Sequence, residues 1–357
     1  MWATASSAAS SAGTWRCEAS SASPARFIWC WATIAGCGFI GSNFIRRLLA
    51  VDPDAEVVNL DALTYAGNLE NLSDVEHHPR YRFVHGDIRD SDAVREAMRD
   101  AEVVVNFAAE THVDRSLLDA GDFVRTDVYG TFVLLNEAAK LPAGQLQCFL
   151  HISTDEVYGD VPPGRSSRET DALRPRSPYS ASKAGAEMMC LAFYETYGLP
   201  AIISRASNTF GPYQYPEKVL PLFITIALDD LPLPVYGDGR QVRDWLFVED
   251  HCRALQLVLE RGEPGEIYNV GAGNERTNIE VACRVLDLLD KPRSLIRHVE
   301  DRPGHDRRYS LDTTKLRALG WSPCSRWEDA LEETVRWYRE HRPWWERIKL
   351  DPRFQDY

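Results

Sequence analysis

The sequence predicts an α/β protein built on a doubly wound parallel sheet, with a smaller, irregular α/β lobe beside it. Three observations support this fold class. Short apolar runs alternate with helical stretches up to about residue 204, the first run is followed by a glycine-rich turn, and after about Arg205 the pattern becomes irregular and richer in Pro, Gly and aromatic residues. Alternation of this kind is typical of a parallel sheet covered by helices on both faces.

Six apolar runs and the stretches between them predict the elements of the larger domain. The expected strands are Phe27–Ile34, Glu56–Leu60, Tyr81–Val84, Val103–Phe107, Cys148–Ile152 and Ala201–Ser204. The expected helices are Gly41–Ala50, Ser91–Arg99, Asp122–Lys140 and Ala184–Tyr197. Further along the chain, a helix over Val248–Arg261 and a strand over Ile267–Val270 are expected to rejoin the sheet.

This pattern predicts two domains and two ends of different character. We expect a cofactor domain from residues 26–204 with about 246–272, and a ligand-binding lobe from about 205–245 with 273–340. Residues 341–357 are expected to form a C-terminal tail. Residues 1–25 contain fifteen Ala or Ser and lack the continuous apolar stretch of a secretory signal. They are either a disordered tail or a wrongly assigned start.

Composition narrows the class of function. The chain of 357 residues has 44% hydrophobic and 26% charged residues, as a soluble globular protein does. Its net charge of −13 disfavours broad binding to nucleic acid or anionic membrane. No apolar run approaches the roughly 18 residues of a membrane span. The eight cysteines are scattered without metal-ligand spacing, which favours reduced thiols in a cytoplasm and no metal site.

The glycine-rich turn is Gly36 to Gly41, and it matches the GxGxxG pattern between a strand and a helix. Glycines at these positions allow a tight turn, close approach to a pyrophosphate and close helix–strand packing, while the helix N-terminus faces the phosphates. Asp61 ends the next strand, about 20 residues on, where a carboxylate binds a ribose diol and repels a 2′-phosphate. Together they predict NAD; the alternative is a glycine turn with an N-capping aspartate.

Two later turns lie at the same predicted edge of the sheet. The segment 86–90 places Asp87 and Ile88 where they could hold an adenine edge. The segment 106–111 has small residues that let the backbone approach a cofactor. Acidic turns and small-residue turns are both common, so neither segment is diagnostic alone.

Tyr179 and Lys183 are four residues apart on a helix predicted to begin at Pro178. Residues at this spacing share a helix face, and a nearby ammonium lowers the pKa of a phenol from about 10. Tyr179 is therefore a candidate base for removing a proton from a sugar hydroxyl as hydride leaves the same carbon. The same spacing also occurs on ordinary solvated helix faces.

Asp155 and Glu156 follow the fifth predicted strand, at the ligand-binding edge of the sheet. Adjacent carboxylates repel each other, and partial burial raises at least one pKa, which yields one protonated acid beside one ionised base. Helix capping is the alternative role. Together with Tyr179 and Lys183, the pair favours elimination chemistry.

At this point the chain resembles the nucleotide-sugar-modifying extended short-chain dehydrogenases and, more narrowly, the dTDP-glucose 4,6-dehydratases. The resemblance covers Gly36 to Tyr338 and rests on GFIGSNFIR, LDALTYAGNLENL, AAETHVDRS, STDEVYGD, SPYSASKAGAE, NTFGPYQYPEKVLP, VYGDGRQVRDWLFVEDHCRA, YNVGAGNERTN and RPGHDRRYSLD. Thr-Asp-Glu before Val-Tyr-Gly is the dehydratase signature, because related 4-epimerases lack the acid pair. The resemblance implies a Rossmann-like fold.

It also implies a three-step reaction. Tyr179, assisted by Lys183, would deprotonate the glucosyl C4 hydroxyl while NAD+ takes the C4 hydride, and Thr154 would bind the C4 oxygen. Glu156 would then remove the C5 proton while Asp155 protonates the departing C6 hydroxyl. Hydride return to C6 would complete a 4-keto-6-deoxy sugar. Oxidation comes first because a carbonyl stabilises the adjacent carbanion.

The same matching implies two sets of ligand-binding residues and a homodimer joined through helices that include the one bearing Tyr179. The cofactor would contact Gly36, Gly38, Phe39, Ile40, Gly41, Asp61, Asp87, Ile88, Ala108, Ala109, Thr111, Thr126, Tyr179, Lys183 and Thr209. The sugar nucleotide, dTDP-glucose, would contact Thr111, Thr154, Asn208, Lys218, Val219, Tyr236, Arg243, Asn278, Arg302 and His305. The cations Lys218, Arg243 and Arg302 suit a diphosphate, although each alone is more often a surface charge.

The chain departs from the family pattern at a few positions. Ala35 replaces the first glycine of the turn, and an Ala there is strained if the backbone needs a positive φ. Trp29 and Trp31 are bulky for the middle of a parallel sheet, and Thr209-Phe210 stands where the family has Asn-Tyr. The alternatives to the dTDP-glucose dehydratase are a 4-epimerase, a 4,6-dehydratase using another nucleotide, and a catalytically silent protein that binds NAD or a nucleotide sugar.

Overall fold

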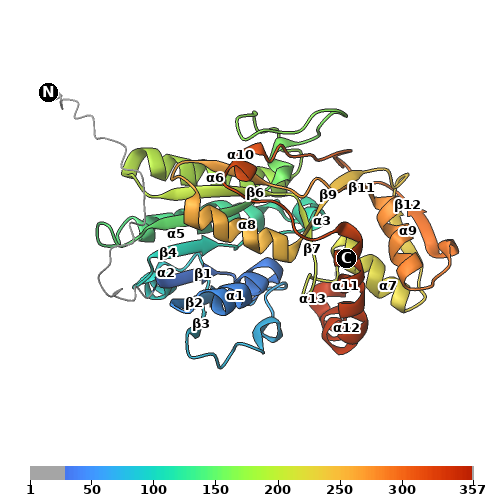
Figure 1. The fold of residues 1–357 in the computed structure, drawn as a ribbon, viewed down its shortest axis with the longest axis horizontal. Coiled ribbons are helices and arrows are strands. Elements are labelled where there is room, and N and C mark those ends of the chain that lie inside the picture. Colours follow the sequence, from blue (N-terminus) through green and yellow to red (C-terminus); the bar gives the residue numbers. More distant parts are fainter. Residues whose placement is uncertain (1–28, 356–357) are drawn as a thin grey trace.

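The computed structural model describes residues 29–355, so the predicted N-terminal tail over 1–25 lies outside the described residues. Its centre is a seven-stranded parallel sheet in the order β10-β6-β5-β4-β1-β2-β3 (Figure 1). The strands are β1 (Trp29–Ile34), β2 (Ala55–Asp61), β3 (Tyr81–His85), β4 (Val103–Asn106), β5 (Cys148–Thr154), β6 (Ala201–Ala206) and β10 (Ile267–Val270). The predicted doubly wound sheet is confirmed. Because β1 pairs with both β2 and β4, the strand order reverses there, which is where such sheets bind ligands.

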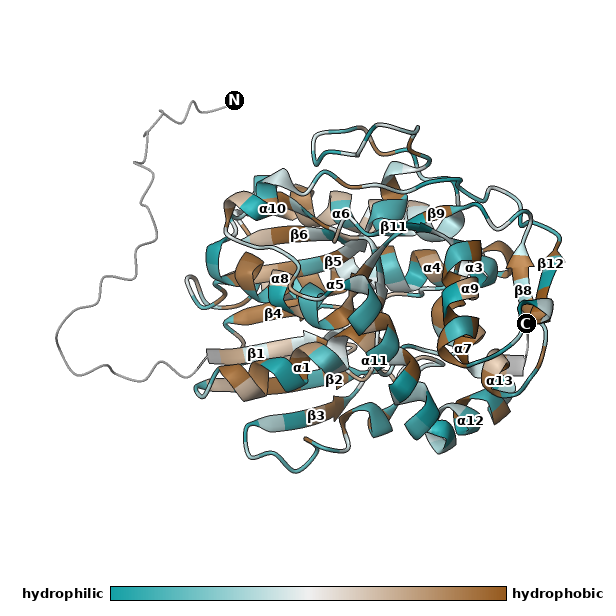
Figure 2. Ribbon diagram, turned by 45° about the vertical axis from the view of Figure 1, so that its right-hand side comes forward, coloured by the Kyte–Doolittle hydropathy of each residue, from teal (hydrophilic) through white to brown (hydrophobic). Residues whose placement is uncertain are grey.

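Two layers of helices cover the sheet. One layer contains α1 (Phe39–Val51) and α8 (Val248–Arg261), and the other contains α2 (Ser91–Met98), α5 (Thr131–Ala138) and α6 (Pro178–Tyr197). The strands β4, β5 and β6 are buried along their whole length, and Figure 2 shows hydrophobic colouring along β4 and β6. Such continuous burial explains why these strands read as apolar runs rather than as alternating patterns.

The helix expected over Asp122–Lys140 is interrupted. Its place is taken by α4 (Ala120–Phe123), a π-helical turn η2 (Val124–Gly130) and α5, after α3 (Val113–Leu118). A π-helical turn inserts an extra residue per turn, so it changes which side chains face the sheet, and such turns are frequent at functional sites.

A second group of elements follows β6. A three-stranded sheet has the order β11-β9-β7 and a two-stranded sheet pairs β12 with β8. The strands are β7 (Asn208–Phe210), β8 (Leu233–Tyr236), β9 (Val242–Phe247), β11 (Glu275–Thr277) and β12 (Ile296–Val299), and the helices are α7 (Val219–Leu228), α9 (Asn278–Leu288), α10 (Thr314–Ala318) and α11 (Trp327–Glu340). Short 3-10 turns are η1 (Leu69–Leu72), η3 (Asp155–Tyr158) and η4 (Arg293–Leu295).

The C-terminal segment is helical, so the expectation of a tail over 341–357 is wrong for its described part. The helices α12 (Arg342–Leu350) and α13 (Pro352–Gln355) end the described chain. Trp344 and Trp345 are 7% and 1% exposed. Two buried indoles contribute several kcal/mol of apolar burial, which is enough to hold a nine-residue helix against the body of the protein.

Trp31, a bulky residue of β1, packs against α1. Trp31 is buried, and its ring centroid lies 6.3 Å from that of Phe44. The cysteines within the described residues are free thiols, and those at 37, 148, 190 and 252 are buried. Within residues 29–355, no helix is long and apolar enough to cross a membrane.

Candidate active site

The glycine turn joins β1 to α1 and is closely packed. A Cβ on Gly36 would lie 2.4 Å from Asn59 Oδ1 and 2.5 Å from Ile45 Cδ1, and one on Gly41 would lie 2.7 Å from the Cα of Gly36. The N-cap of α1 is Gly38, which has no side chain to bind the first amides of the helix. These amides are therefore available to an anion, as the sequence predicted.

Ala35 has a φ of 59°, so the family's glycine position does require the left-handed region. The turn forms nonetheless: the Ala35 amide donates to Leu60 O at 2.7 Å, and its carbonyl accepts from the Gly38 amide at 3.3 Å. An alanine in this region is strained by about 1 kcal/mol. The substitution therefore costs stability locally without removing the turn.

Asp61 is held at the carboxyl end of β2 by two backbone amides. Its Oδ2 accepts from Cys37 N at 2.9 Å and its Oδ1 from Leu63 N at 2.8 Å. Burial raises the pKa of Asp61, and these amides act in the opposite direction. Among the described residues Asp61 does not cap α1, whose N-cap is Gly38, nor η1, whose N-cap is Asn68. A glycine cradle, free helix amides and a fixed carboxylate fit a dinucleotide.

A cavity of about 280 Å³ opens at the carboxyl ends of the central strands. It brings together the acid pair and twelve residues of the two predicted ligand-binding sets, namely Gly38, Phe39, Ile40, Asp61, Ala109, Thr111, Thr154, Asp155, Glu156, Tyr179, Lys183, Asn208, Thr209 and Lys218. The glycine turn and the proposed acid–base groups therefore share one site.

Tyr179 is placed by the N-terminus of α6. Pro178 opens the helix, and Ser177 and Ser180 form a capping box in which each backbone amide donates to the other's Oγ at 3.1 Å. Lys183, one turn later, donates from Nζ to Ile152 O of β5 at 2.7 Å. The predicted helix start and the shared face of Tyr179 and Lys183 are both confirmed, since both side chains line the cavity.

The expectation that Lys183 lowers the pKa of Tyr179 is wrong for the protein without ligands. Burial raises the pKa of the Tyr179 phenol well above its usual value, and the negative charges of Glu156 and Asp127 act in the same direction. A hydrogen bond with Thr154 opposes them. Burial also lowers the pKa of Lys183. Desolvation is therefore the largest cause of both shifts.

The sequence predicted that burial raises at least one pKa of the acid pair, and it raises both. Burial raises the pKa of Asp155 well above its usual value, and the charge of Glu156 adds to this effect. Burial also raises the pKa of Glu156, but Arg302, Arg243 and Lys218 oppose it. The pKa of both carboxyl groups is therefore raised, and Lys218 and Arg302 act against this rise at Glu156 in addition to Arg243.

The three predicted cations surround this pair from different elements. Lys218 Nζ donates to the carbonyl oxygen of Thr111, and Arg302 Nη1 lies 3.3 Å from Asp114 Oδ1. Arg243 stacks on the ring of Tyr309 with its Cζ 4.2 Å from the ring centroid. Of the three, only Lys218 lines the central cavity, while Arg243 and Arg302 act on Glu156 from outside that lining. Three positive charges near Glu156 suit a diphosphate.

Other predicted ligand-binding residues lie outside the central cavity. Tyr236 donates to Asp114 Oδ2 at 3.4 Å and meets the ring of His305 edge-on at 6.0 Å, beside Arg302. Asn278 opens α9, where its buried Oδ1 accepts no hydrogen bond from the described residues, and Val219 opens α7. The remaining predicted contacts outside it are Gly36, Gly41, Asp87, Ile88, Ala108, Thr126, Arg243 and Arg302.

Asp87 and Ile88, two of these residues, contact other side chains of the protein. Asp87 pairs with Arg89 at 2.5 Å, and Ile88 is buried against Gly130, where an added Cβ would lie 2.3 Å from Ile88 Cδ1. Thr209 Oγ1 lies 3.0 Å from His251 Nδ1, and Phe210 is buried with its ring centroid 5.1 Å from that of Trp327. Local contacts therefore accommodate Thr209 and Phe210 at the positions where the family has Asn and Tyr.

Sequence reasoning missed Asp127, which lies in the π-helical turn. Its Oδ1 accepts from Glu110 N at 2.9 Å and its Oδ2 from Ser182 Oγ at 2.5 Å. Burial raises the pKa of Asp127 to about 6, with Lys183 opposing, and burial raises that of Glu110 to about 7. The family resemblance had pointed to the neighbouring Thr126, and no local pattern in the sequence reveals a π-helical turn at this position.

Residues of the C-terminal helix were missed as well. Trp344 and Ile348 of α12 line the central cavity together with Asn68, Asn71 and Tyr213. The signal in the sequence was the Trp-Trp pair directly after Pro343.

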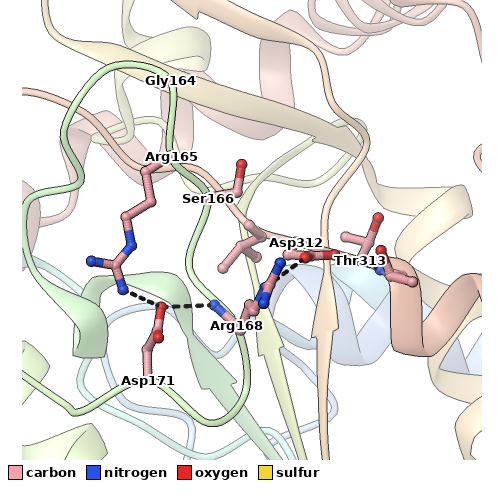
Figure 3. Close-up of a pocket in the computed structure, with 9 residues that line it drawn as sticks. Gly164, Arg165, Ser166, Arg168, Asp171, Asp312 and Thr313 are labelled. Carbon is pink, nitrogen blue, oxygen red and sulfur yellow. Dashed lines mark hydrogen bonds and ion pairs between the residues drawn. The ribbon is translucent and has the colours of Figure 1, made fainter.

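A second cavity, of about 590 Å³, lies between the loop 164–171 and the segment 311–314. Figure 3 shows Arg165 directed toward Asp171 and Arg168 toward Asp312. The corresponding ion pairs measure 3.0 and 3.2 Å. Because each of these guanidinium groups already has a carboxylate partner, this cavity offers a ligand little uncompensated charge.

Comparison with known proteins agrees with this site. The family model described as GDP-mannose 4,6 dehydratase matches residues 34–334. The chain is 49% identical over 319 residues to the dTDP-glucose 4,6-dehydratase of Streptomyces niveus, covering 88% of this chain and 94% of that protein. It is 51% identical over 303 residues to the low-salt glycan biosynthesis protein Agl12 of Haloferax volcanii, covering 85% and 96%.

A solved structure supports the fold. The dTDP-glucose 4,6-dehydratase of Streptomyces venezuelae, solved with NAD bound, is 49% identical and superposes with a TM-score of 0.87, covering 90% of this chain and all of that one. Shared fold and near-half identity along almost the whole length establish common ancestry. The chain belongs to the nucleotide-sugar 4,6-dehydratase family, among the relatives of the dTDP-glucose 4,6-dehydratases.

Proposed function

We propose that this protein is an NAD-dependent dTDP-glucose 4,6-dehydratase, which converts dTDP-glucose to dTDP-4-keto-6-deoxyglucose with loss of water. The observation that carries the proposal is that Asp155 and Glu156 share one cavity with Tyr179, Lys183 and the glycine turn, while burial raises the pKa of both carboxyl groups and three cations oppose this rise at Glu156. When bound, NAD supplies the hydride acceptor for C4 and, in its reduced form, the donor for C6.

For the oxidation, Tyr179 would receive the proton of the C4 hydroxyl. Thr154 supports this role because its side chain hydrogen-bonds the Tyr179 phenol. Lys183, bound to Ile152 O, supplies the positive charge that stabilises a phenolate. Asp127 supports that charge, since it raises the pKa of Lys183 against the effect of burial.

For the elimination, Glu156 would remove the C5 proton and Asp155 would protonate the leaving C6 hydroxyl. Glu156 suits the base because three cations favour its carboxylate. Asp155 suits the acid because its burial keeps it neutral, and its Oδ2 accepts no hydrogen bond from the described residues. The division of roles follows from the two environments rather than from the side chains themselves.

The substrate nucleotide would extend from this centre toward the cations. Lys218, Arg243 and Arg302 would bind the diphosphate, and Asn208, Asn278, Tyr236 and His305 would hold the sugar and the base. The preference for thymidine is drawn from the relatives, of which two are named as dTDP-glucose dehydratases. The division into a cofactor domain and a nucleotide-sugar lobe, with the boundaries predicted above, belongs to the same proposal.

The enzyme would act as a homodimer in the cytoplasm. An exposed apolar face on η2, α5 and α6 supports the dimer; it comprises Val124, Tyr129, Phe132, Met188 and Tyr197, which are 36% to 66% exposed. Isolated monomers rarely leave such a face uncovered. The free, buried thiols support a reducing compartment.

The direct test is to incubate the purified protein with dTDP-glucose and NAD and to follow the sugar nucleotide by mass spectrometry. Loss of one water that disappears in Glu156→Gln is the expected result. A product of unchanged mass that co-elutes with dTDP-galactose would instead identify a 4-epimerase. Turnover of UDP- or GDP-glucose in preference to dTDP-glucose would overturn the assigned nucleotide.

A further inference from the structure

We propose that the C-terminal helix α12 belongs to the cofactor site. Its Trp344 holds the segment 67–72 against the glycine turn, Gly36 to Gly41, and thereby retains NAD between turnovers. The inference rests on the proposed function, because it takes NAD as the ligand of that turn. It assigns a role to a part of the chain that lies beyond the family match to residues 34–334.

The first support is a pair of hydrogen bonds from this segment to the turn itself. The carbonyl oxygen of Cys37, in the middle of the glycine turn, accepts from Asn71 Nδ2 at 2.9 Å and from Asn68 N at 3.2 Å. The segment therefore lies directly on the turn. The packing between the segment and Asp61 is equally tight, since a Cβ on Gly67 would lie 2.7 Å from Asp61 Oδ1.

The second support is the bond that fixes Asn71 from behind. Trp344 donates from Nε1 to Asn71 Oδ1 at 2.9 Å, although the two residues are 273 positions apart. Asn71 and Trp344 are 2% and 7% exposed. The amide thus receives a hydrogen bond from α12 through its oxygen and donates one to the turn through its nitrogen. This arrangement fixes the amide in one orientation.

The third support is the position of α12 at the cavity. Trp344 and Ile348 are four residues apart, share a face of the helix and line the same cavity as Tyr179 and Lys183. The outer side of α12 is also attached to the segment, because Arg347 Nη2 lies 2.6 Å from Glu70 Oε2. The helix is therefore a wall of the site and not merely packed on its outside.

Retention of the cofactor suits the proposed reaction. Each turnover returns NAD to its oxidised form, so the cofactor has no need to exchange with solvent. An attachment that slows its release therefore does not slow turnover. By contrast, moving the segment 67–72 away from the turn would break its hydrogen bonds to Cys37 O and the hydrogen bond from Trp344 to Asn71.

The experiment compares Trp344→Phe with Trp345→Phe. Each variant keeps an aromatic ring and loses one buried indole hydrogen bond, but the bond of Trp345 goes to Tyr338 O at 2.8 Å, away from the cavity. Each protein is loaded with NADH, excess NAD+ is added, and the fall in NADH fluorescence gives the dissociation rate constant. Cofactor retained after gel filtration is measured in parallel.

We expect Trp344→Phe to release NADH roughly 3- to 10-fold faster than the wild type, as the loss of one neutral hydrogen bond predicts. Trp345→Phe should release it at the wild-type rate. Equal release from Trp344→Phe and the wild type would overturn the inference, and so would equal acceleration in both variants, which would indicate general loosening of α12. A wild-type protein that binds no NADH overturns the proposed function and this inference with it.

An Asn71→Ala variant and its combination with Trp344→Phe separate the bond from the bulk of the ring. If the attachment runs through Asn71, the double variant should release NADH no faster than Asn71→Ala alone. Multiplicative effects of the two substitutions would show that Trp344 acts independently of Asn71, and the proposed connection would be wrong.

Discussion

Lys183 of α6 donates a hydrogen bond to the carbonyl of Ile152 in β5 at 2.7 Å, two residues before Thr154. This bond ties the helix that carries Tyr179 to the strand that leads into Asp155 and Glu156. The groups proposed for the oxidation and for the elimination are therefore tied together, although they lie on different elements.

The two acids should be separable by isotope exchange. In Asp155→Asn, Glu156 can still remove the C5 proton but the leaving hydroxyl lacks its acid, so deuterium from D2O should enter C5 without loss of water. In Glu156→Gln neither exchange nor water loss should occur, and turnover should fall about 10²- to 10⁴-fold. Mass spectrometry of the sugar nucleotide measures both. Exchange in Glu156→Gln at the wild-type rate would remove Glu156 as the base.

The strain at Ala35 should be relieved by glycine. Because Ala35 has a φ of 59°, Ala35→Gly removes the strain of the left-handed conformation. Glycine also raises the conformational entropy of the unfolded chain, which offsets part of this gain in stability. The net result should be a stabilisation of roughly 0.5 to 1 kcal/mol in chemical denaturation. The buried Ala32 of β1 is the matched control, since Ala32→Gly should destabilise the protein. Destabilisation by both substitutions would refute the strain.

Glu110 should make stability fall with rising pH. Burial and the charge of Asp127 raise its pKa from 4.5 to about 7, so the folded state binds the proton more tightly than the unfolded chain does. Its contribution is therefore full below pH 4.5 and is lost as the pH rises toward 7. Glu110→Gln should be more stable than the wild type at pH 8, by roughly 1 to 3 kcal/mol, and similar to it at pH 4.5.

Urea unfolding at both pH values measures this difference. Glu332→Gln, on the exposed side of α11, is the control and should leave the pH dependence of the wild type unchanged. A Glu110→Gln protein that loses stability at pH 8 would mean that the carboxylate makes a favourable contact there.

Arg302 should contribute mainly to substrate binding. Arg302→Met removes a cation from the wall around Glu156, so KM for dTDP-glucose should rise about 10- to 100-fold, as expected for a charged hydrogen bond. The acid limb of the pH profile should also move to higher pH, because Arg302 lowers the pKa of Glu156. Arg168→Met, in the second cavity, is the control and should change neither quantity. A normal KM in Arg302→Met would place the diphosphate elsewhere.

The exposed apolar face should mediate dimer formation. Tyr129→Glu and Met188→Glu place charges in this face and should shift the protein to monomers in size-exclusion chromatography with light scattering. Leu350→Glu is the control, because Leu350 is 72% exposed on α12, outside the face. Dimers that persist in both variants would locate the interface on another surface.

Much of the fold could be predicted because its signals are local. The apolar runs, the turn at Gly36 to Gly41 and the Ser177-Pro178 helix start each depend on neighbours within a few residues, and the structure reproduces them nearly at the expected positions. The acid pair was predictable too, because a parallel sheet places the carboxyl ends of its strands at one edge.

By itself, therefore, the sequence determined the order of elements, the glycine turn, Asp61 and the residues Thr154, Asp155, Glu156, Tyr179 and Lys183 as one site. The tertiary structure alone decided that burial raises the pKa of Tyr179 and that a π-helical turn places Asp127 near Lys183. It also decided that Trp344 donates a hydrogen bond to Asn71. Burial, helix register and contacts across 273 residues depend on how the whole chain packs, and no local pattern carries that information.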